Sequence, residues 1–462
     1  MKSQAAIIEM DWNQFGDPQV VAHQYAHEKG FAWLDSASSD HQDSRYHIIA
    51  RKPELTLTAH HHEVKLHPHT QRSLPSIPKQ IEGQPFKILE FIAQQMAWSV
   101  PESDSLPFKG GWLGYWGYDA GRYLESLPER ARDDIRLPDI KMGWYNAALI
   151  IDMVQQRVVV VGHAPSAEAL ASELKSHSPN EYSAQFQLTS EWKSNMTAAE
   201  YANKFSRVQD YLHAGDCYQV NLAQRHQAHF TGSPFAAYCA LRQHNKGPFS
   251  AFVNGTEGQV LSVSPERFIR CDGQKIQTKP IKGTRPRKES PQADQSEKVA
   301  LQNSEKDRAE NLMIVDLLRN DIGRVAAPGT VDVPGLFEIE SFPAVHHLVS
   351  TVTADLNPSH SVYDLLAACF PGGSITGAPK IRAMEIIEEL EPNRRSVYCG
   401  AIGYISVDGT MDTNIAIRTL VCDPNTIYCW AGGGLVADSQ CNDEYQETID
   451  KVSRILPLLS AL

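Results

Sequence analysis

The Asp272-Gly273 dipeptide constrains the fold most strongly, because it separates two strand-like runs by a two-residue turn. The runs cover residues 260–270 and 274–281. An Asp-Gly pair between such runs predicts a β-hairpin with antiparallel strands. One arm of this hairpin carries Glu266, and Lys282 directly follows the other arm.

The relative orientation of Glu266 and Lys282 depends on the register of this hairpin. In an ideal register Glu266 lies opposite Lys279, which places Lys282 on the other face of the sheet. Pro265 and Pro280 cannot donate hydrogen bonds to a β-ladder, so a bulge or an early end of pairing is expected here. Either irregularity could turn both side chains into one cavity.

Lys282 lies in the segment TKPIKGTRPR, between Pro280-Ile281 and Gly283-Thr284. A proline limits the backbone and a glycine lets another group approach closely, so the amine could be held in a defined pose. A nucleophilic lysine would be presented in this way. A lysine beside a Gly-Thr turn is more commonly a solvated surface charge. The other residues of the chain must therefore decide between a nucleophile and a surface charge.

Two pairs of acidic residues are spaced three apart on expected helices. Asp307 and Glu310 fall on one stripe of a helix expected over residues 296–325, and Glu444 and Glu447 lie on the last helix. Each pair is either a solvated helix edge or half of a metal site. Mg²⁺ is a hard cation that suits such carboxylates.

Capping and proline patterns predict where three other helices begin. The capping box at residues 197–200 opens a helix that is expected to run to Ala214. Pro379 is expected in the first turn of a helix ending at Leu390. The last helix could be capped by Asn442 and continues through Ile455.

Two glycine-rich segments are suited to binding an anion. The segment PGGSITGAPK leads into a helix, where free backbone N–H groups and the helix dipole favour a carboxylate or phosphate. Its spacing is not that of a Walker loop, so nucleotide binding is the weaker alternative. Gly432, Gly433 and Gly434 form a second cradle before the last helix. With Arg418 between them, these segments indicate a site for a small molecule with two negative groups.

The segment CYQVNLA alternates in the way that a β-strand does. Tyr218, Val220 and Leu222 are expected on one face. Gln219 and Asn221 are expected together on the other face.

The 462 residues, 42% of them apolar and 21% charged, have an ordinary globular composition, enough for one large or two ordinary domains. The Ser- and Ala-rich stretch 164–194 is predicted to connect two regions. It is expected to separate an N-terminal region, residues 1–163, from a second region, residues 195–462.

The net charge of −12 argues against nucleic acid or an anionic membrane as the main partner. Neither a signal peptide nor an apolar run of about 18 to 20 residues is present, so a cytoplasmic protein is expected. The eight cysteines form no CxxC pair, which fits reduced thiols and no zinc site.

Several motifs in order resemble the chorismate-utilising enzymes, most strongly from about residue 197 onward. These motifs are YQVNLAQR, SPERF, PIKGT, AENLMIVDLLRND, HHLVS, GGSITGAPK and NDEYQET. The resemblance implies an α+β fold, like that of anthranilate synthase component I. Large, mostly antiparallel β-sheets pack face to face with helices outside, and the catalytic site lies in the second region.

Two positions indicate the branch of the family that this chain resembles. Anthranilate synthases typically carry alanine where this chain has Lys282, and members that aminate chorismate at C4 carry lysine. Members that use water as the nucleophile carry a lysine at the position of Gln219. The resemblance therefore implies conversion of chorismate and ammonia to 4-amino-4-deoxychorismate, on the route to p-aminobenzoate and folate. The alternatives are anthranilate synthesis and a non-catalytic protein that binds tryptophan or a partner.

The resemblance also implies roles for individual residues. Lys282 would attack C2 of the ring as the 4-hydroxyl leaves, ammonia would then enter at C4, and Glu266 would shuttle the protons. The amine must be neutral for this, so desolvation and a nearby Mg²⁺ or Lys279 would have to lower its pKa. Mg²⁺ would be bound by Glu310 and Glu447, with Asp307 and Glu444 acting through waters. The residues implied in substrate binding are Gln219, Gly283, Thr284, His347, Ser374, Gly377, Tyr398, Arg418, Gly432, Gly433 and Gly434.

The resemblance implies two further ligands or partners besides chorismate. No cysteine lies in the Gly-x-Cys-x-Gly setting of a glutaminase nucleophile, so a separate glutamine amidotransferase subunit is expected to supply ammonia. The segment containing Leu34, Asp35 and Ser36 resembles one that forms a tryptophan pocket in relatives.

Overall fold

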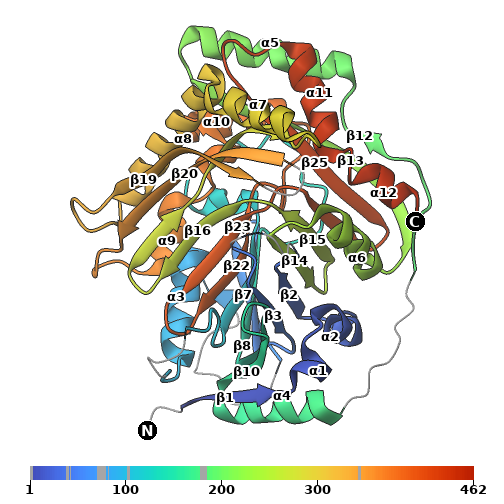
Figure 1. Cartoon of the computed structure of the whole chain (residues 1–462), viewed down its shortest axis with the longest axis vertical. Coiled ribbons are helices and arrows are strands. Elements are labelled where there is room, and N and C mark those ends of the chain that lie inside the picture. The colour runs from blue at the N-terminus through green and yellow to red at the C-terminus, as the bar shows by residue number, and fades with distance from the viewer. Residues whose placement is uncertain are drawn as a thin grey trace.

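Two large antiparallel sheets form the framework of the computed structural model (Figure 1). It describes residues 4–37, 41, 43–69, 80–81, 83–100, 105–176, 185–341 and 345–462. The first sheet has the order β1 (Ala5–Met10), β10 (Arg157–His163), β9 (Ala147–Asp152), β3 (Tyr46–Ala50), β2 (Phe31–Asp35), β14 (Phe249–Asn254), β15 (Gln259–Ser264), β24 (Thr419–Asp423), β25 (Thr426–Leu435), β13 (Gln219–Gly232) and β11 (Phe186–Leu188). Strands β12 (Lys193–Ser194) and β21 (Gly377–Ala378) also pair with β13.

The second sheet lies against the first. Its order is β18 (Ile281–Pro286), β20 (Val345–Asp355), β17 (Lys275–Thr278), β16 (Arg267–Asp272), β23 (Met411–Ile415), β22 (Ala401–Ser406), β7 (Gly111–Trp116), β8 (Ile140–Tyr145), β4 (Leu55–His60), β5 (Glu63–Pro68) and β6 (Gln80–Ile81), with β19 (Asp332–Ser341) paired to β20.

Helices cover the outside of the sheets. In chain order they are α1 (Trp12–Phe15), α2 (Pro18–Tyr25), α3 (Pro85–Met96), α4 (Ala164–Ser176), α5 (Ala198–Ala214), α6 (Pro234–Asn245), α7 (Pro291–Gln302), α8 (Glu305–Gly323), α9 (Val362–Cys369), α10 (Lys380–Leu390), α11 (Cys441–Val452) and α12 (Leu456–Ser460), with 3₁₀ turns η1 (Tyr118–Tyr123) and η2 (Gly373–Ile375). Figure 1 shows α5, α10 and α11 at one end of the molecule, and α4 with β1 at the opposite end.

Alternate residues of the first sheet contribute to two different cores. In β2, Ala32 faces the core between the sheets, whereas Phe31 and Trp33 join the core under the outer helices. Ile48 and Ile49 of β3 divide in the same way. Such strands are apolar on both faces because both faces are covered. The expected architecture, antiparallel sheets packed face to face with helices outside, is confirmed.

Strands from both predicted regions join both sheets. β2 from residues 1–163 pairs with β14, and β7 from the same region pairs with β22. The division at residues 164–194 therefore stays a prediction about sequence organisation, because it does not separate two sheets. None of the helices in the described ranges is long and apolar enough to cross a membrane.

The predicted helix that begins at the capping box is confirmed, since α5 starts after Thr197 with both capping hydrogen bonds and ends at Ala214. The predicted bounds of three other helices are wrong. The helix expected over 296–325 is two helices, α7 and α8, separated at Asn303 and Ser304. Pro379 is the N-cap residue of α10, one position before its first turn.

The last helix differs from the prediction at both ends. Gln440, not Asn442, is the N-cap residue of α11, and it makes no side-chain capping hydrogen bond. Helix α11 ends at Val452, and Ile455 precedes the separate helix α12.

The hairpin is confirmed, but its turn lies one residue later than predicted. Asp272 pairs with Lys275, so Gly273, with φ +65°, and Gln274 form the turn. The register of β16 against β23 shifts between Arg267 and Ile269, and β17 ends at Thr278. The early end of pairing expected in the hairpin is therefore present, because β16 and β17 pair only from Asp272 to Arg270, whereas the register shift involves β16 and β23.

Candidate active site

Glu266 and Lys282 converge on Ser374 in the loop before α10. Lys282 Nζ donates to the Ser374 carbonyl at 3.2 Å, and Ser374 Oγ donates to Glu266 Oε1 at 3.3 Å. Glu266 is only 6% exposed. The irregular β16–β17 hairpin thus brings an acid and an amine to one serine.

The shared environment shifts the pKa values of both groups. Burial raises the pKa of Glu266 to about 7, against the attraction of Lys282. Burial lowers the pKa of Lys282, and the positive charge of Lys451 adds to this effect, whereas Glu310 and Glu266 oppose it. Lys279, expected as one alternative source of this effect, is ion-paired with Glu340 and is not among the main groups that shift this pKa.

Gly283 forms a bulge directly after Lys282. Its φ is +79°, and the register of β18 against β20 shifts between Lys282 and Thr284. A Cβ at Gly283 would lie 2.9 Å from the side chain of Asp307 on α8. Only glycine therefore fits where β18 passes the acidic helix.

His347 lies beside this bulge and is held by Thr284. Thr284 Oγ1 lies 2.8 Å from His347 Nδ1. Burial, and next the charge of Arg418, lower the pKa of His347 to about 4, so its ring is neutral at neutral pH. The neighbouring His346 is fully buried and hydrogen-bonded to Ser341 and Asp294, which gives it a structural role.

Two of the predicted acids, Glu310 on α8 and Glu444 on α11, meet at Lys306. Its Nζ lies 3.9 Å from Glu310 Oε1 and 3.8 Å from Glu444 Oε1. Burial raises the pKa of both carboxyl groups, and repulsion from Asp307 and Glu447 adds to it. Carboxylates that repel one another between two helices have the donor chemistry that a hard divalent cation needs.

The remaining two acids are each paired with a cation. Asp307 accepts from Arg285 at 3.0 Å, and Glu447 lies 2.6 Å from Lys451. Burial would raise the pKa of Glu447, but Lys451 brings it below the usual value. The four acids form a loose group, because no three of their ligand atoms lie within 4.8 Å of one another. Among the described residues, only His60, His61 and Asp133 are so close together.

Gln219 leaves two buried polar atoms unsatisfied at the start of β13. Its side chain is fully buried, and neither Oε1 nor Nε2 has a hydrogen-bond partner. Asn221 Oδ1, two residues along the strand, is buried and unpaired as well. Such atoms are costly unless a ligand or water satisfies them, so they indicate a binding site for a polar molecule.

Tyr218 departs from the expected strand face. It precedes β13 and is 71% exposed, whereas Val220 and Leu222, which were expected on the same face, are buried within the strand.

The glycine-rich segment before α10 packs closely against β13. Gly377, with φ +142°, pairs with Val220, and a Cβ there would lie 2.1 Å from the Gln219 carbonyl. Ser374 is buried in the preceding 3₁₀ turn. The segment therefore holds Ser374 beside Lys282.

Gly432, Gly433 and Gly434 lie in the last part of strand β25, shortly before α11. They pair with β13, and β24 pairs with β25 only up to Cys429 in the described part of the chain. A Cβ at Gly434 would lie 2.1 Å from Gln219 Nε2, and one at Gly433 would lie 3.1 Å from Glu444 Oε2. The glycines thus keep space open between Gln219 and the acids.

Tyr398 and Arg418 complete the set of predicted residues. The Tyr398 ring stacks on Trp430 at 5.9 Å between centroids, and burial raises its pKa. Arg418 has φ +48°, and burial, with the nearby Arg454, lowers its pKa. The charge of Arg418 contributes to the lowered pKa of His347.

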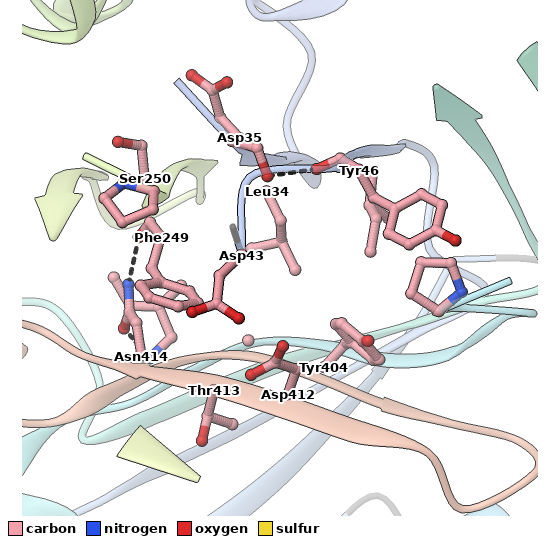
Figure 2. A pocket seen from close by; sticks show the side chains of 16 residues that line it. Leu34, Asp35, Asp43, Tyr46, Phe249, Ser250, Tyr404, Asp412, Thr413 and Asn414 are labelled. Carbon is pink, nitrogen blue, oxygen red and sulfur yellow. Dashed lines mark hydrogen bonds between the residues drawn. The ribbon is translucent and has the colours of Figure 1, made fainter. Parts of the chain in front are cut away.

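A separate cavity of about 100 Å³ lies between the two sheets (Figure 2). Leu34 and Ser36 line it from the first sheet, and Tyr404 and Asp412 line it from the second. The carboxylate of Asp35 points away from this space, because it accepts from Tyr238 and pairs with His47 and Arg242. The segment predicted as a tryptophan pocket thus borders a cavity, but the Asp35 side chain belongs to the framework.

Two lysines beside the predicted acids were missed from the sequence. Lys306 lies between Glu310 and Glu444, and Lys451 influences both Glu447 and Lys282. Each lies four residues from a predicted acid on the same helix, so helical spacing could have identified them.

Comparison with known proteins identifies the family. Residues 30–457 match the family described as chorismate binding enzyme. The chain is 50% identical over 455 residues to "Aminodeoxychorismate synthase component 1" of Escherichia coli (strain K12), covering 98% of each chain. It is 35% identical over 436 residues to "Anthranilate synthase component 1" of Cereibacter sphaeroides, covering 90% of this chain and 87% of the relative.

A solved structure agrees with these sequence matches. Anthranilate synthase component I from Streptococcus pneumoniae superposes with a TM-score of 0.78 at 32% identity, over 89% of this chain and 92% of that one. The fold, the convergent acid and lysine, and the sequence matches lead to one conclusion. The chain belongs to the family of chorismate binding enzymes.

Proposed function

We propose that this chain aminates chorismate at C4, using ammonia to form 4-amino-4-deoxychorismate. The observation that carries the proposal is the position of Lys282, whose lowered pKa favours the neutral amine, beside the carboxyl group of Glu266. The near-complete match to an Escherichia coli protein of the corresponding name supports it. Anthranilate synthesis is less favoured, because it does not need a nucleophilic lysine at this position.

In the proposed reaction, Lys282 Nζ forms a bond to C2 of chorismate. The two ring double bonds shift, the C4–O bond breaks, and the hydroxyl leaves as water with a proton from Glu266. Ammonia then bonds to C4, the double bonds shift back, and the C2–N bond to Lys282 breaks. Glu266 accepts the proton that the incoming ammonia loses. The overall reaction consumes chorismate and ammonia and releases the aminated product and water.

The remaining residues bind and orient the substrate. The unpaired amide of Gln219 and the space beside Gly432, Gly433 and Gly434 would accept the enolpyruvyl carboxylate, with Tyr398 and Arg418. Ser374 and Gly377 would border the ring carboxylate. Neutral His347, held by Thr284 at the Gly283 bulge, would lie near the ring.

Mg²⁺ fits the acidic residues of α8 and α11. Glu310 and Glu447 would be its ligands, with Glu444 and Asp307 acting through waters, and the ion would supply positive charge for the ring carboxylate. The raised pKa values of Glu310 and Glu444 support this assignment, because a cation would relieve their repulsion. We expect Glu310→Gln to raise the Mg²⁺ concentration needed for half-maximal activity. An unchanged Mg²⁺ dependence in both Glu310→Gln and Glu447→Gln would contradict the assignment.

A glutamine amidotransferase subunit would supply the ammonia. Burial raises the pKa of all eight cysteine thiols, so none has the low pKa of a glutaminase nucleophile. The words "component 1" in the names of the relatives also fit a second subunit. We expect ammonium salt to support turnover by the chain alone, and glutamine to support it only with the partner.

The cavity between the sheets would hold tryptophan. Leu34 provides an apolar wall, and the carboxylates of Asp43 and Asp412, which both pair with Arg267, line the same space. Mass spectrometry under native conditions after incubation with tryptophan measures this binding directly. Binding that survives Leu34→Trp, which fills the cavity, would contradict this location.

Product identification and adduct trapping test the proposed activity. Purified protein with chorismate, Mg²⁺ and ammonium salt should form aminodeoxychorismate, and fluorescent anthranilate or isochorismate would refute the proposal. Protein quenched with chorismate but without ammonia should carry added mass on the Lys282 peptide. Lys282→Ala should abolish both results. Lys275→Ala, at an exposed position of the same hairpin, should leave both unchanged.

A further inference from the structure

Three consecutive histidines form the end of the β4–β5 hairpin, far along the second sheet from the hairpin that carries Lys282. His60 is the last residue of β4, and His61 and His62 form the two-residue turn before Glu63. Both turn residues have positive φ, +48° and +64°. The proposed amination uses none of these residues.

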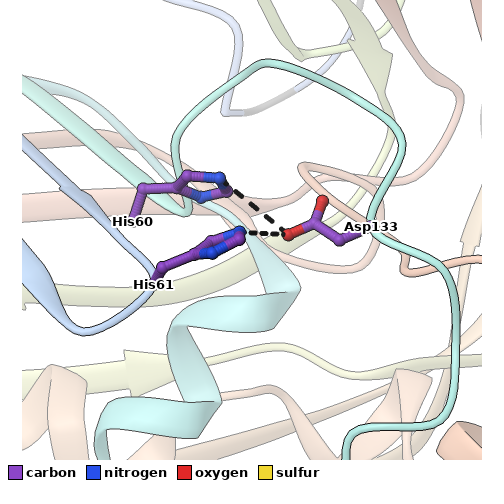
Figure 3. Close-up of side chains that lie close together, drawn as sticks. All are labelled: His60, His61 and Asp133. Carbon is purple, nitrogen blue, oxygen red and sulfur yellow. Dashed lines mark hydrogen bonds and ion pairs between the residues drawn. The ribbon is translucent and has the colours of Figure 1, made fainter.

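His60 and His61 direct their rings at one carboxylate, that of Asp133 in the segment before β8 (Figure 3). Nε2 of His61 lies 2.8 Å from Asp133 Oδ2, and Nε2 of His60 lies 3.9 Å from the same oxygen. Ligands about 2.0 to 2.1 Å from a tetrahedral zinc ion are roughly 3.3 Å apart, which lies between these two distances. Small rotations of the side chains would therefore place all three atoms around one ion.

The surroundings of His60 provide the outer contacts typical of a metal-binding histidine. Its second ring nitrogen, Nδ1, is buried and lies 3.5 Å from Asp139 Oδ1, which is an ion-pair distance without a hydrogen bond. Asp139 is itself held by the hydroxyl of Tyr123, which donates to Oδ2 at 3.1 Å. A carboxylate on Nδ1 leaves Nε2 free as the ligand atom and fixes the ring orientation. Arg394 Nη1 donates at 3.1 Å to Asp133 Oδ2, the same oxygen that the two histidines face.

Space for further ligands is present beside the histidines. A cavity of about 240 Å³ borders His61, Asp139 and Arg394, which is room for one or more waters. The absence of a CxxC pair led us to expect no zinc site. Two imidazoles and a carboxylate are a different ligand set, which suits zinc and similar transition metals better than Mg²⁺.

We propose that His60, His61 and Asp133 bind a divalent transition metal, with zinc as the preferred ion and water completing its coordination. The ion connects the β4–β5 hairpin to the segment before β8. It is separate from the proposed Mg²⁺ site on α8 and α11.

Two asparagine substitutions in the same turn test this site. Asparagine tolerates positive φ, so neither His61→Asn nor His62→Asn should disturb the turn. His61→Asn removes a ligand, whereas His62 contacts the Tyr123 ring and makes no contact with Asp133 among the described interactions. Circular dichroism and turnover with ammonium salt should show both variants folded and active.

Calorimetric titration with zinc chloride, in excess Mg²⁺, measures binding. Wild type and His62→Asn should bind one zinc ion with similar affinity, and His61→Asn should bind it at least about tenfold more weakly. Asp139→Asn should weaken binding by roughly 10- to 100-fold. No binding by wild type, equal binding by His61→Asn, or equal loss in both turn variants would overturn the proposal.

Cobalt substitution checks the ligand type. The visible spectrum of cobalt-loaded protein should show imidazole and oxygen ligation. A sulfur-to-cobalt charge-transfer band would place the ion on a cysteine and would also overturn the proposal.

Discussion

Burial shifts the pKa values of Glu266 and Lys282 towards each other. The carboxyl group titrates near pH 7, and the amine loses its proton more readily than a solvated lysine. Both groups are therefore biased towards their neutral forms in the absence of substrate. A neutral amine and a protonated acid are the forms that the first step of the proposed reaction needs.

Glu266 should make the stability of the protein depend on pH. The folded protein holds the proton on Glu266 up to about pH 7, and the unfolded chain releases it near 4.5. The folded state binds more protons between these values, so the free energy of unfolding falls as pH rises through this window. Relative to Glu266→Gln, the free energy of unfolding of wild type should fall by roughly 3 kcal/mol across this pH window.

Urea unfolding at several pH values measures this difference. Glu305→Gln, at an exposed position on α8, is the control and should follow wild type at every pH. A constant difference between wild type and Glu266→Gln would mean that Glu266 is not buried in its acid form.

The β18 strand owes its shape to the bulge at Gly283. Gly283→Ala adds strain at φ +79° and places a Cβ 2.9 Å from Asp307, so it should displace β18 from α8. Gly273→Ala is a matched control, because Gly273 has φ +65° but open space around its Cβ position. We expect the control to lose about 1–2 kcal/mol of stability and to retain activity.

Gly283→Ala should lose more stability than the control and most of its activity, since Lys282 is adjacent. Thermal unfolding and initial rates with ammonium salt measure both effects. Equal losses in the two variants would show that contact with Asp307 does not matter.

Elements defined by local chemistry were predictable, and those defined by distant contacts were not. The capping box at Thr197 lies within four residues, so the start of α5 followed from the sequence. The break at Asn303 and the position of Gly432 to Gly434 inside β25 depend on packing against other segments. The convergence of Glu266 and Lys282 required an irregular register, which proline positions suggested but could not fix.

At the scale of the whole molecule, the two predicted regions share one framework. Residues 195–462 alone would lose β2 beside β14 and β7 beside β22, and with them the buried Trp33, Trp112 and Trp144. Exposed strand edges and apolar faces of this kind favour aggregation.

We therefore expect residues 195–462 expressed alone to be insoluble or to unfold without a cooperative transition. Co-expression with residues 1–194 should restore part of the soluble protein. Differential scanning calorimetry provides the measurement, and a cooperative transition from the second region alone would contradict this expectation.

The sheet order also determines when the chain can fold during its synthesis. β22 and β24 are among the last strands to be translated, yet β22 lies between β7 and β23, and β24 lies between β15 and β25. Neither sheet can be completed until these late strands leave the ribosome. Pairings between residues so distant in the sequence form slowly, because a long loop must close first. The apolar faces of the early strands therefore stay uncovered until then. A chain released before residue 401 lacks the centre of the second sheet, and in the first sheet it lacks the strands that connect β15 to β13.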